Sequence, residues 1–285
     1  MTNFFRILSI ALTAGTLAAC SFTVPAKSTK TNSDRSQIIN GTEIGENELI
    51  AHSIVNIRLP SGNFCTGVLL NDHVVLTAAH CMKPGMVGMS VVASHASPSC
   101  FAGIIREVSV APKLPGNTFA PDLALLKLDR ALCPVAPTAL VANIKTNTVI
   151  IGAGFGKGST SAQAETMTMK VVSSDKEYLK ALYLNDFPND AQVLEDWNFV
   201  ESNFAEFSEM YLFALAKNSE QSLCFGDSGG PVYREKDGAL YIFGVVGGGF
   251  PHSKNGVPGC QNTYLQLFAP LGPSMGWLQT QLNKW

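Results

Sequence analysis

Charged residues are scarce in this sequence of 285 residues, of which they make up 15%. Lys and Arg number 20 against 22 for Asp and Glu, and no basic run occurs. Nucleic-acid-binding proteins usually carry a basic patch or stripe, so this charge distribution argues against that class of partner. It favours neutral peptides or proteins as partners, and the length and the 46% hydrophobic content suffice for a packed core.

The N-terminal hydrophobic run is too short to span a bilayer. It extends from Ile7 to Ala19 behind Arg6, whereas a transmembrane helix needs about 20 residues. We therefore predict a signal peptide over residues 1–19 and export of the chain. Residues 20–37 contain almost no large apolar side chains, which predicts a disordered propeptide or tether.

The end of this run, Leu17-Ala18-Ala19-Cys20, resembles a bacterial lipobox. In that reading Cys20 becomes the lipid-bearing first residue of a cell-envelope lipoprotein. The alternative is a plain signal peptide cut after Ala19, followed by secretion once the propeptide is cleaved.

The sequence has seven cysteines, an odd number for an exported chain. Acylation of Cys20 would leave six cysteines for three disulfides, an arithmetic that favours the lipoprotein. A rival role for Cys20 is a disulfide that tethers the propeptide. Six cysteines allow fifteen connectivities, so their spacing alone does not choose the pairs.

A glycine-rich stretch, Cys224-Phe225-Gly226-Asp227-Ser228-Gly229-Gly230-Pro231, presents a serine in a turn. A serine hydroxyl is a weak nucleophile, which needs a base and a third group that orients the base. Candidates for these two roles are His80 in Thr77-Ala78-Ala79-His80-Cys81 and Asp122 in Pro121-Asp122-Leu123-Ala124-Leu125-Leu126-Lys127-Leu128.

These three motifs, in the order His, Asp, Ser, resemble the chymotrypsin-like (trypsin-like) serine protease family from about Ile38 to Trp285. The resemblance implies an all-β fold of two six-stranded antiparallel barrels with a C-terminal helix. It also implies a serine endopeptidase in which His80 is the base and Asp122 orients it. Ser228 would be the nucleophile, and the backbone N–H groups of Gly226 and Ser228 would form the oxyanion hole. No metal or cofactor is implied, and we expect a monomer.

The resemblance also assigns the substrate pocket, the activation site and the disulfides. The pocket residues would be Ser222, Leu223, Gly249 and Asn262. Ser222 replaces the aspartate of trypsins, so we expect cleavage after apolar residues. Activation would pair a freed amine at Ile38 with Asp227. The implied disulfides are Cys65 with Cys81 and Cys224 with Cys260, which leaves Cys100 with Cys133. A serine common in the family near the catalytic aspartate is Gly247 here.

Short apolar runs broken by Gly, Pro and Asn predict twelve strands in two sets. The first barrel is expected over residues 38–145, and the second, with the C-terminal helix, over 146–285. The first set is 54–59, 66–70, 74–77, 90–93, 104–110 and 123–128. The second set is 148–152, 167–173, a strand that begins at 208 or later and ends at 216, then 231–234, 241–247 and 263–268. The glycine-rich segment 152–158 is predicted to be a turn.

Two segments have helical periodicity. Trp197, Val200, Phe204, Phe207 and Tyr211 predict one amphipathic helix, in a region about twenty residues longer than is usual in the family. We expect it to pack on the core, although a docking element for another protein is the alternative. At the C-terminus, Ser274 is expected to cap a helix that packs on the second barrel through Leu278, Leu282 and Trp285.

An alternative to the protease is a catalytically weak or inactive homologue that acts as a binding module. Such proteins usually lack one of the three catalytic residues, whereas this chain has His80, Asp122 and Ser228. An esterase of another fold is excluded, because the serine motif is not Gly-x-Ser-x-Gly between a strand and a helix.

Overall fold

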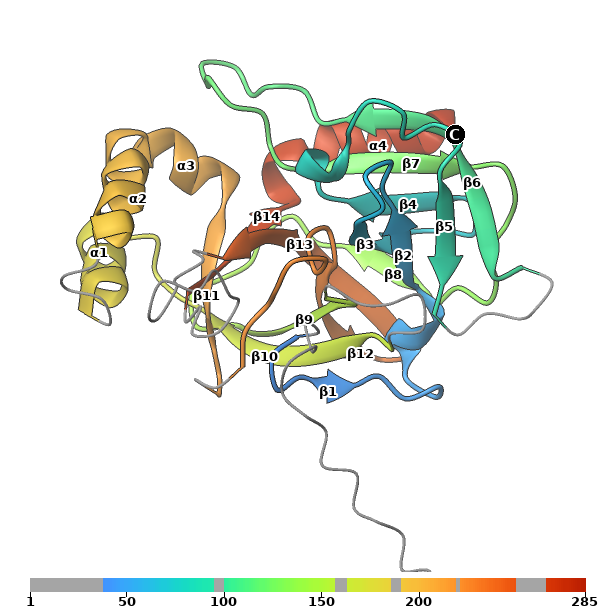
Figure 1. Ribbon diagram of the computed structural model, residues 1–285, viewed down its shortest axis with the longest axis horizontal. Helices are drawn as coiled ribbons and strands as arrows, with labels where there is room; N and C mark the ends of the chain where they lie inside the picture. Colours follow the sequence, from blue (N-terminus) through green and yellow to red (C-terminus); the bar gives the residue numbers. More distant parts are fainter. Residues whose placement is uncertain (1–37, 95–99, 157–162, 186–190, 219–220, 250–264) are drawn as a thin grey trace, which may run out of the picture. The chain divides into compact units, whose positions relative to one another are not determined.

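The computed structural model describes residues 38–94, 100–156, 163–185, 191–218, 221–249 and 265–285. All twelve predicted strands are present, most within two residues of their predicted bounds. They form two closed six-stranded antiparallel barrels (Figure 1), which confirms the predicted fold class.

The first barrel closes in the order β2-β3-β4-β7-β6-β5. Its strands are β2 (Ile54–Arg58), β3 (Phe64–Leu69), β4 (Val74–Thr77), β5 (Ser90–Ala93), β6 (Ala102–Val110) and β7 (Ala124–Leu128). Two short 3-10 helices, η1 (Leu49–His52) and η2 (Ala79–Cys81), precede β2 and follow β4. Strand β4 lies between β3 and β7, and all four of its residues are buried.

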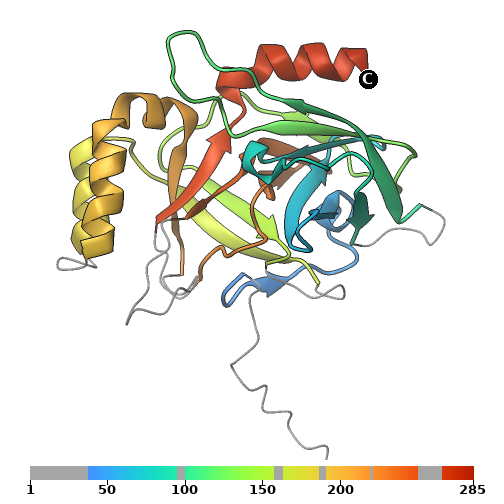
Figure 2. The same ribbon diagram turned by 45° about the horizontal axis from the view of Figure 1, so that its top comes forward.

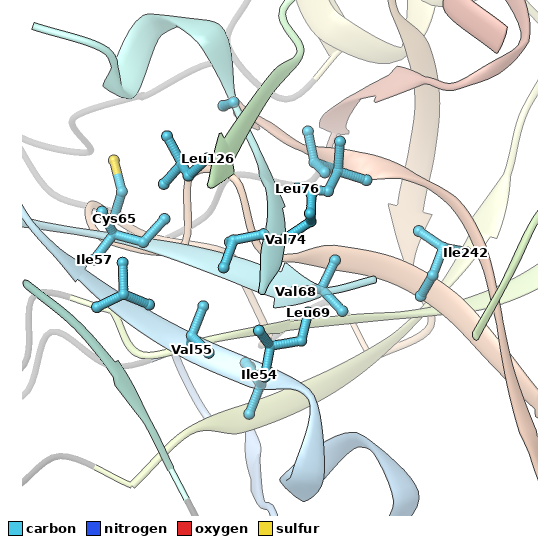
Figure 3. Packing of buried hydrophobic residues seen from close by; sticks show 14 of the residues in the cluster. Ile54, Val55, Ile57, Cys65, Val68, Leu69, Val74, Leu76, Leu126 and Ile242 are labelled. Atoms are coloured by element: carbon cyan, nitrogen blue, oxygen red, sulfur yellow. The ribbon is translucent and has the colours of Figure 1, made fainter. Parts of the chain in front are cut away.

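Branched aliphatic side chains of this barrel are buried on both faces of its strands, and they form one cluster with residues of the second barrel such as Ile242 (Figure 3). Ile54, Val55 and Ile57 of β2 are all fully buried, and Val68 and Leu76 pack with them in one cluster. This close packing gives the barrel a rigid edge from which site residues can project.

The second barrel closes in the order β9-β10-β11-β14-β13-β12, with β12 pairing back to β9. Its strands are β9 (Val149–Gly154), β10 (Glu165–Val171), β11 (Leu212–Ala216), β12 (Pro231–Lys236), β13 (Ala239–Gly249) and β14 (Leu265–Pro270). Two further short strands, β1 (Thr42–Glu43) and β8 (Thr138–Leu140), add to this sheet through β10 and β13. The predicted range of the first barrel, 38–145, therefore includes two segments that pair with the second sheet.

The prediction of a turn at residues 152–158 is wrong for its first part, because β9 continues to Gly154. Position 154 in this strand requires glycine, because the side chain of Asp227 packs where a Cβ would be. The glycines there permit close approach of another segment, which is a second reason for glycine besides a turn.

The prediction of one helix in the long segment before β11 is also wrong, because the segment forms three helices. They are α1 (Lys176–Asn185), α2 (Ala191–Ser202) and α3 (Phe204–Met210), with a break at Asn203 and with Tyr211 at the end of α3. Trp197 and Val200 of α2 pack with Leu179 of α1 in a cluster that includes residues of β11 and β14. This packing on the core agrees with the expected role of the segment.

The C-terminal helix α4 (Met275–Lys284) follows the 3-10 helix η3 (Gly272–Ser274). Its predicted position is wrong: it packs against β6 of the first barrel (Figure 2), where Trp277 Nε1 donates to Ser109 Oγ at 3.2 Å. Ser274 is at the N-cap position, but its side chain makes no capping hydrogen bond. Its hydroxyl is buried without a partner among the described residues. No helix in the described part of the chain is long and apolar enough to cross a bilayer.

Candidate active site

Two neighbouring strands of the first barrel bring His80 and Asp122 together. Strand β4 ends at Thr77, just before His80, and β7 begins at Ala124, just after Asp122. Thr77 and Ala124 are paired in the antiparallel register of these strands. The two residues that flank this pair therefore lie at the same edge of the barrel.

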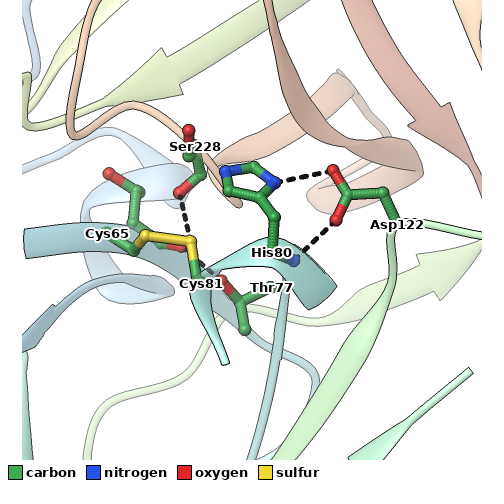
Figure 4. Close-up of polar contacts among 7 residues, drawn as sticks. Cys65, Thr77, His80, Cys81, Asp122 and Ser228 are labelled. Carbon is green, nitrogen blue, oxygen red and sulfur yellow. Dashed lines mark hydrogen bonds and ion pairs between the residues drawn. A yellow bond between two sulfur atoms is a disulfide. The ribbon is translucent and has the colours of Figure 1, made fainter. Parts of the chain in front are cut away.

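Two hydrogen bonds hold the Asp122 carboxylate against His80 (Figure 4). The backbone N–H of His80 donates to Asp122 Oδ1 at 2.8 Å, and His80 Nδ1 lies 2.8 Å from Asp122 Oδ2. Because an ionised carboxylate only accepts hydrogen bonds, Nδ1 carries the proton and Nε2 is left as an acceptor. The Asp122 side chain is 6% exposed and that of His80 is 43% exposed, so the ring is accessible while its partner is buried.

Ser228 lies beside the part of the His80 ring that faces away from Asp122 (Figure 4), and both residues line one cavity. No hydrogen bond joins the Ser228 hydroxyl to His80 within the described residues. Such a contact is often long in an unliganded site and shortens when substrate binds. His80 therefore lies between Asp122 and Ser228, which is the order that nucleophilic catalysis by serine requires.

Thr66 of β3 anchors the loop that carries Ser228. Its backbone N–H donates to the Ser228 carbonyl at 2.9 Å, and its hydroxyl donates to the Gly226 carbonyl at 2.7 Å. The same hydroxyl accepts from the Phe155 N–H at 3.2 Å, and Thr66 is fully buried. The motifs in the sequence did not point to Thr66, because a threonine in a predicted strand has no distinguishing feature.

The N–H groups of Gly226 and Ser228 donate no hydrogen bond to any group in the described part of the chain. Both residues line the cavity next to His80. Unpaired backbone donors beside a serine hydroxyl are suited to stabilise negative charge on a carbonyl oxygen.

Two glycines after Ser228 are required by close packing. Gly229 has a φ of 81°, and a Cβ there would overlap Thr77 Oγ1. A Cβ on Gly230 would overlap the carbonyl oxygen of Ala153 in β9. The loop is thus pressed between the two barrels, where no side chain fits.

Asp227 is fully buried next to the serine. Its carboxylate accepts from the N–H of Gly156 and of Cys224, each at 2.7 Å. Burial raises the pKa of Asp227 to about 7, with a smaller contribution from Glu165, although the two N–H donors oppose the rise. No cationic side chain pairs with it among the described residues.

The first described residues lie close to the cavity base. Ile38 is 2% exposed, and Ile39 forms a two-way backbone bridge with Ser222, at 2.8 and 3.3 Å. This bridge holds Ile39 against the segment that leads to Asp227.

The cavity has a volume of about 510 Å³. Of the predicted pocket residues, Leu223 lines it, whereas Ser222 is 1% exposed and donates its hydroxyl to the Leu223 carbonyl at 2.9 Å. Gly249 is the last residue of β13, and Asn262 lies outside the described residues. No acidic side chain is among the described residues that line the cavity, and residues 250–264 contain none in the sequence.

Disulfides join Cys65 to Cys81 and Cys100 to Cys133. The first links β3 to the segment of His80. Cys224 is also disulfide-bonded, and Cys260, its expected partner, lies outside the described residues, as does Cys20.

Gly247, at the position where the resemblance implies a serine, lies beside Asp122. The ring of Tyr211 occupies the space that a side chain at Gly247 would fill. Tyr211 was predicted as one residue of a helix face, and nothing in the sequence pattern connected it with Asp122.

Comparison with known proteins agrees with this geometry. The family model for trypsin matches residues 38–269. Trypsin-1 of Astacus astacus is 27% identical over 212 residues, which cover 70% of this chain and 82% of that protein. Coagulation factor IX of Oryctolagus cuniculus is 25% identical over 230 residues, which cover 77% of this chain and 78% of that protein.

Solved structures share the fold. HL collagenase superposes with a TM-score of 0.61 at 21% identity, over 86% of this chain and 99% of the collagenase chain. The scabies mite inactivated protease paralogue S-D1 superposes with a TM-score of 0.59 at 14% identity, over 86% of this chain and 97% of its own. The fold is therefore shared with a structure named a collagenase and with one named an inactivated protease paralogue, and these two likenesses show the fold alone. The match to the family model shows the family. Since that match spans most of the sequence, the chain belongs to the trypsin family.

Proposed function

We propose that this protein is a serine endopeptidase that hydrolyses peptide bonds through His80, Asp122 and Ser228. The observation that carries the proposal is the arrangement of the buried Asp122, the half-exposed His80 and Ser228. Next to them, the backbone N–H groups of Gly226 and Ser228 donate no hydrogen bond within the described residues. Each of these features has a role in acyl transfer, and an inactive binding module would have no need of the whole set.

In the proposed reaction Ser228 Oγ attacks the scissile carbonyl while His80 Nε2 takes its proton. Asp122 keeps the Nδ1 proton in place and stabilises the imidazolium that forms. The N–H groups of Gly226 and Ser228 stabilise the oxyanion. His80 then protonates the leaving amine as the peptide bond breaks. In the second half of the reaction His80 takes a proton from water, which attacks the acyl carbonyl, and returns that proton to Ser228 Oγ as the ester bond breaks.

The test is the substitution Ser228→Ala. Peptide hydrolysis is expected to fall by several orders of magnitude, because the nucleophile is lost. The melting temperature is expected to stay near that of the parent, since the hydroxyl makes no hydrogen bond to His80. Ser202→Ala, which changes an exposed serine on α2, is the matched control and is expected to retain full activity. An inactive parent would favour the binding module instead, whereas an active Ser228→Ala would show that the assignment of the triad is wrong.

We infer a preference for apolar residues before the cleaved bond. The inference is supported by Leu223 on the cavity wall and by the lack of acidic residues in the described lining. A cation buried there would have no partner, which is unfavourable. Matched peptides that end in Phe, Leu, Ala or Arg are expected to show kcat/KM at least about ten-fold lower for Arg, the effect of about 1.4 kcal/mol. Faster cleavage of the Arg peptide would contradict the inference.

We also propose that cleavage before Ile38 activates the enzyme. The proposal is supported by the burial of Ile38, by the bridge from Ile39 to Ser222, and by a buried Asp227 that lacks a cation among the described residues. A freed amine at Ile38 would supply that cation. Gln37 precedes the bond, so trypsin is expected to cut it poorly, although Arg35 is near. The activator would be another protease or the enzyme itself.

If Cys20 bears a lipid, the same cleavage would release the enzyme from the membrane. Residues 20–37 would be the tether, which the cut before Ile38 separates from the protease domain, 38–285, unless a disulfide retains it. Activation and release are then one event.

A further inference from the structure

Tyr211 and Asp122 both lie next to Gly247, so the ring is beside the carboxylate although the two residues are far apart in the sequence. Burial raises the pKa of Tyr211, and the negative charge of Asp122 and hydrogen bonding to its carboxylate add to the rise. The tyrosine therefore stays protonated at physiological pH, and its hydroxyl is available as a donor. The Asp122 carboxylate already accepts from two donors on His80, the backbone N–H and the ring Nδ1.

Gly247 makes this contact possible. A Cβ at Gly247 would lie 2.7 Å from Tyr211 Cε1 and 3.5 Å from Asp122 Oδ2. The first distance is too short for two carbon atoms, so a larger residue at position 247 would displace the ring. The tyrosine and the glycine thus fit each other, beside the carboxylate.

The ring of Tyr211 is held at the end of helix α3. Its backbone N–H donates to the Phe207 carbonyl at 2.9 Å, and the two rings are 4.9 Å apart at their centroids. The partly buried ring packs against residues of both the main core cluster and the cluster under α1 and α2. Its hydroxyl is therefore presented in a defined direction.

Helix α3 also holds the loop that leads to Asp122. The Glu206 carboxylate accepts from the Thr118 N–H at 2.7 Å and from the Thr118 hydroxyl at 3.1 Å. Glu209 accepts from Asn117 Nδ2 at 2.9 Å. Helix α3 thus holds the segment before Asp122, and Tyr211, directly after the helix, lies beside the Asp122 carboxylate.

We propose that Tyr211 is a positioning residue, whose hydroxyl, presented by α3, orients the Asp122 carboxylate toward His80 Nδ1. The role rests on the proposed function, because the orientation matters for the reaction only if His80 is the base. With this role, the long segment that contains α1, α2 and α3 would contribute to the active site as well as pack on the core.

The first test is Tyr211→Phe, which removes the hydroxyl and keeps the ring. We expect kcat to fall about ten-fold, as loss of a hydrogen bond to a charged group implies, with KM unchanged. Tyr178→Phe on α1, where the side chain is 42% exposed, is the matched control and is expected to leave kcat unchanged. A kcat of Tyr211→Phe equal to that of the parent overturns the proposal.

Rescue separates positioning from packing. Tyr211→Ala is expected to lower both kcat and the melting temperature, because the ring is lost. Adding Gly247→Ser should recover much of kcat, since its hydroxyl would extend from a Cβ that is 3.5 Å from Asp122 Oδ2. Gly247→Ser alone should lower kcat, because the serine meets the ring. If the double variant is no faster than Tyr211→Ala, the hydroxyl is not what matters.

A third measurement does not depend on turnover. A histidine Nδ1 proton that is hydrogen-bonded to a carboxylate gives a proton NMR resonance far downfield, and its shift reports the geometry of that bond. We expect Tyr211→Phe to move this resonance and Tyr178→Phe to leave it in place. A parent without peptidase activity whose resonance still depends on Tyr211 would refute the proposed function and retain the positioning role. A resonance unchanged in Tyr211→Phe would overturn the role.

Discussion

Individual residues of the site differ in how visible they are in the sequence. His80, Asp122 and Ser228 stand in recognisable motifs, because the chemistry dictates both the residue and its neighbours. Thr66 holds the serine loop through its hydroxyl, and we propose that Tyr211 orients Asp122 through its own; in both cases the fold sets the partner. A hydroxyl with a distant partner leaves no local pattern to detect.

At Thr66 we predict that Thr66→Val destabilises the protein by about 1–3 kcal/mol, since the buried N–H of Phe155 and the carbonyl of Gly226 both lose their partner. Urea unfolding at fixed pH measures the difference. Thr66→Ser keeps the hydroxyl and is expected to cost less. Equal stability of the valine variant and the parent would show that the loop is held by other contacts.

Secondary-structure elements were predicted well where one kind of periodicity applies. Short apolar runs broken by Gly, Pro and Asn located all twelve barrel strands. Two elements were predicted wrongly: β9 continues through Gly154, where the side chain of Asp227 leaves no room for a Cβ, and the helical region breaks at Asn203. Helix α4 turns toward β6 because Trp277 and Trp285 find acceptors there, at Ser109 and Glu107.

For the whole molecule, the buried Asp227 makes the stability depend on pH, and the proposed activation would change that dependence. Its pKa is about 7 in the folded chain against 3.8 for an ordinary aspartate. The folded protein therefore binds more protons than the unfolded chain between these values. The contribution of Asp227 to the free energy of unfolding is fully present below pH 3.8 and is lost as pH rises through 7.

We predict that the uncleaved precursor loses stability between pH 4 and pH 7 by up to about 1.4 kcal/mol per pH unit from this group. The form cleaved before Ile38 is expected to lose less, because the new amine pairs with the ionised carboxylate. Urea unfolding of Ser228→Ala in both forms measures this without self-cleavage. Asp227→Asn should remove the difference between the two slopes. Identical slopes in the cleaved and uncleaved forms would contradict the pairing.

Release from the membrane is tested on the active parent enzyme. N-terminal sequencing of active enzyme is expected to begin at Ile38, and membrane fractionation should find that form in the soluble fraction. An active form that begins at Cys20 and stays with the membrane would contradict the coupling of activation to release.

Local sequence determined the strands, the order of the three motifs and the small residues of the serine loop, because short-range periodicity and backbone sterics act within a few residues. Tertiary structure alone decided that Thr66 holds the loop, that the Tyr211 ring lies beside Asp122, and that α4 packs on the first barrel. These contacts join residues far apart in the chain, such as the pair Asp122 and Tyr211. Their partners are chosen by which surfaces the two barrels bring together, and no local pattern encodes that choice.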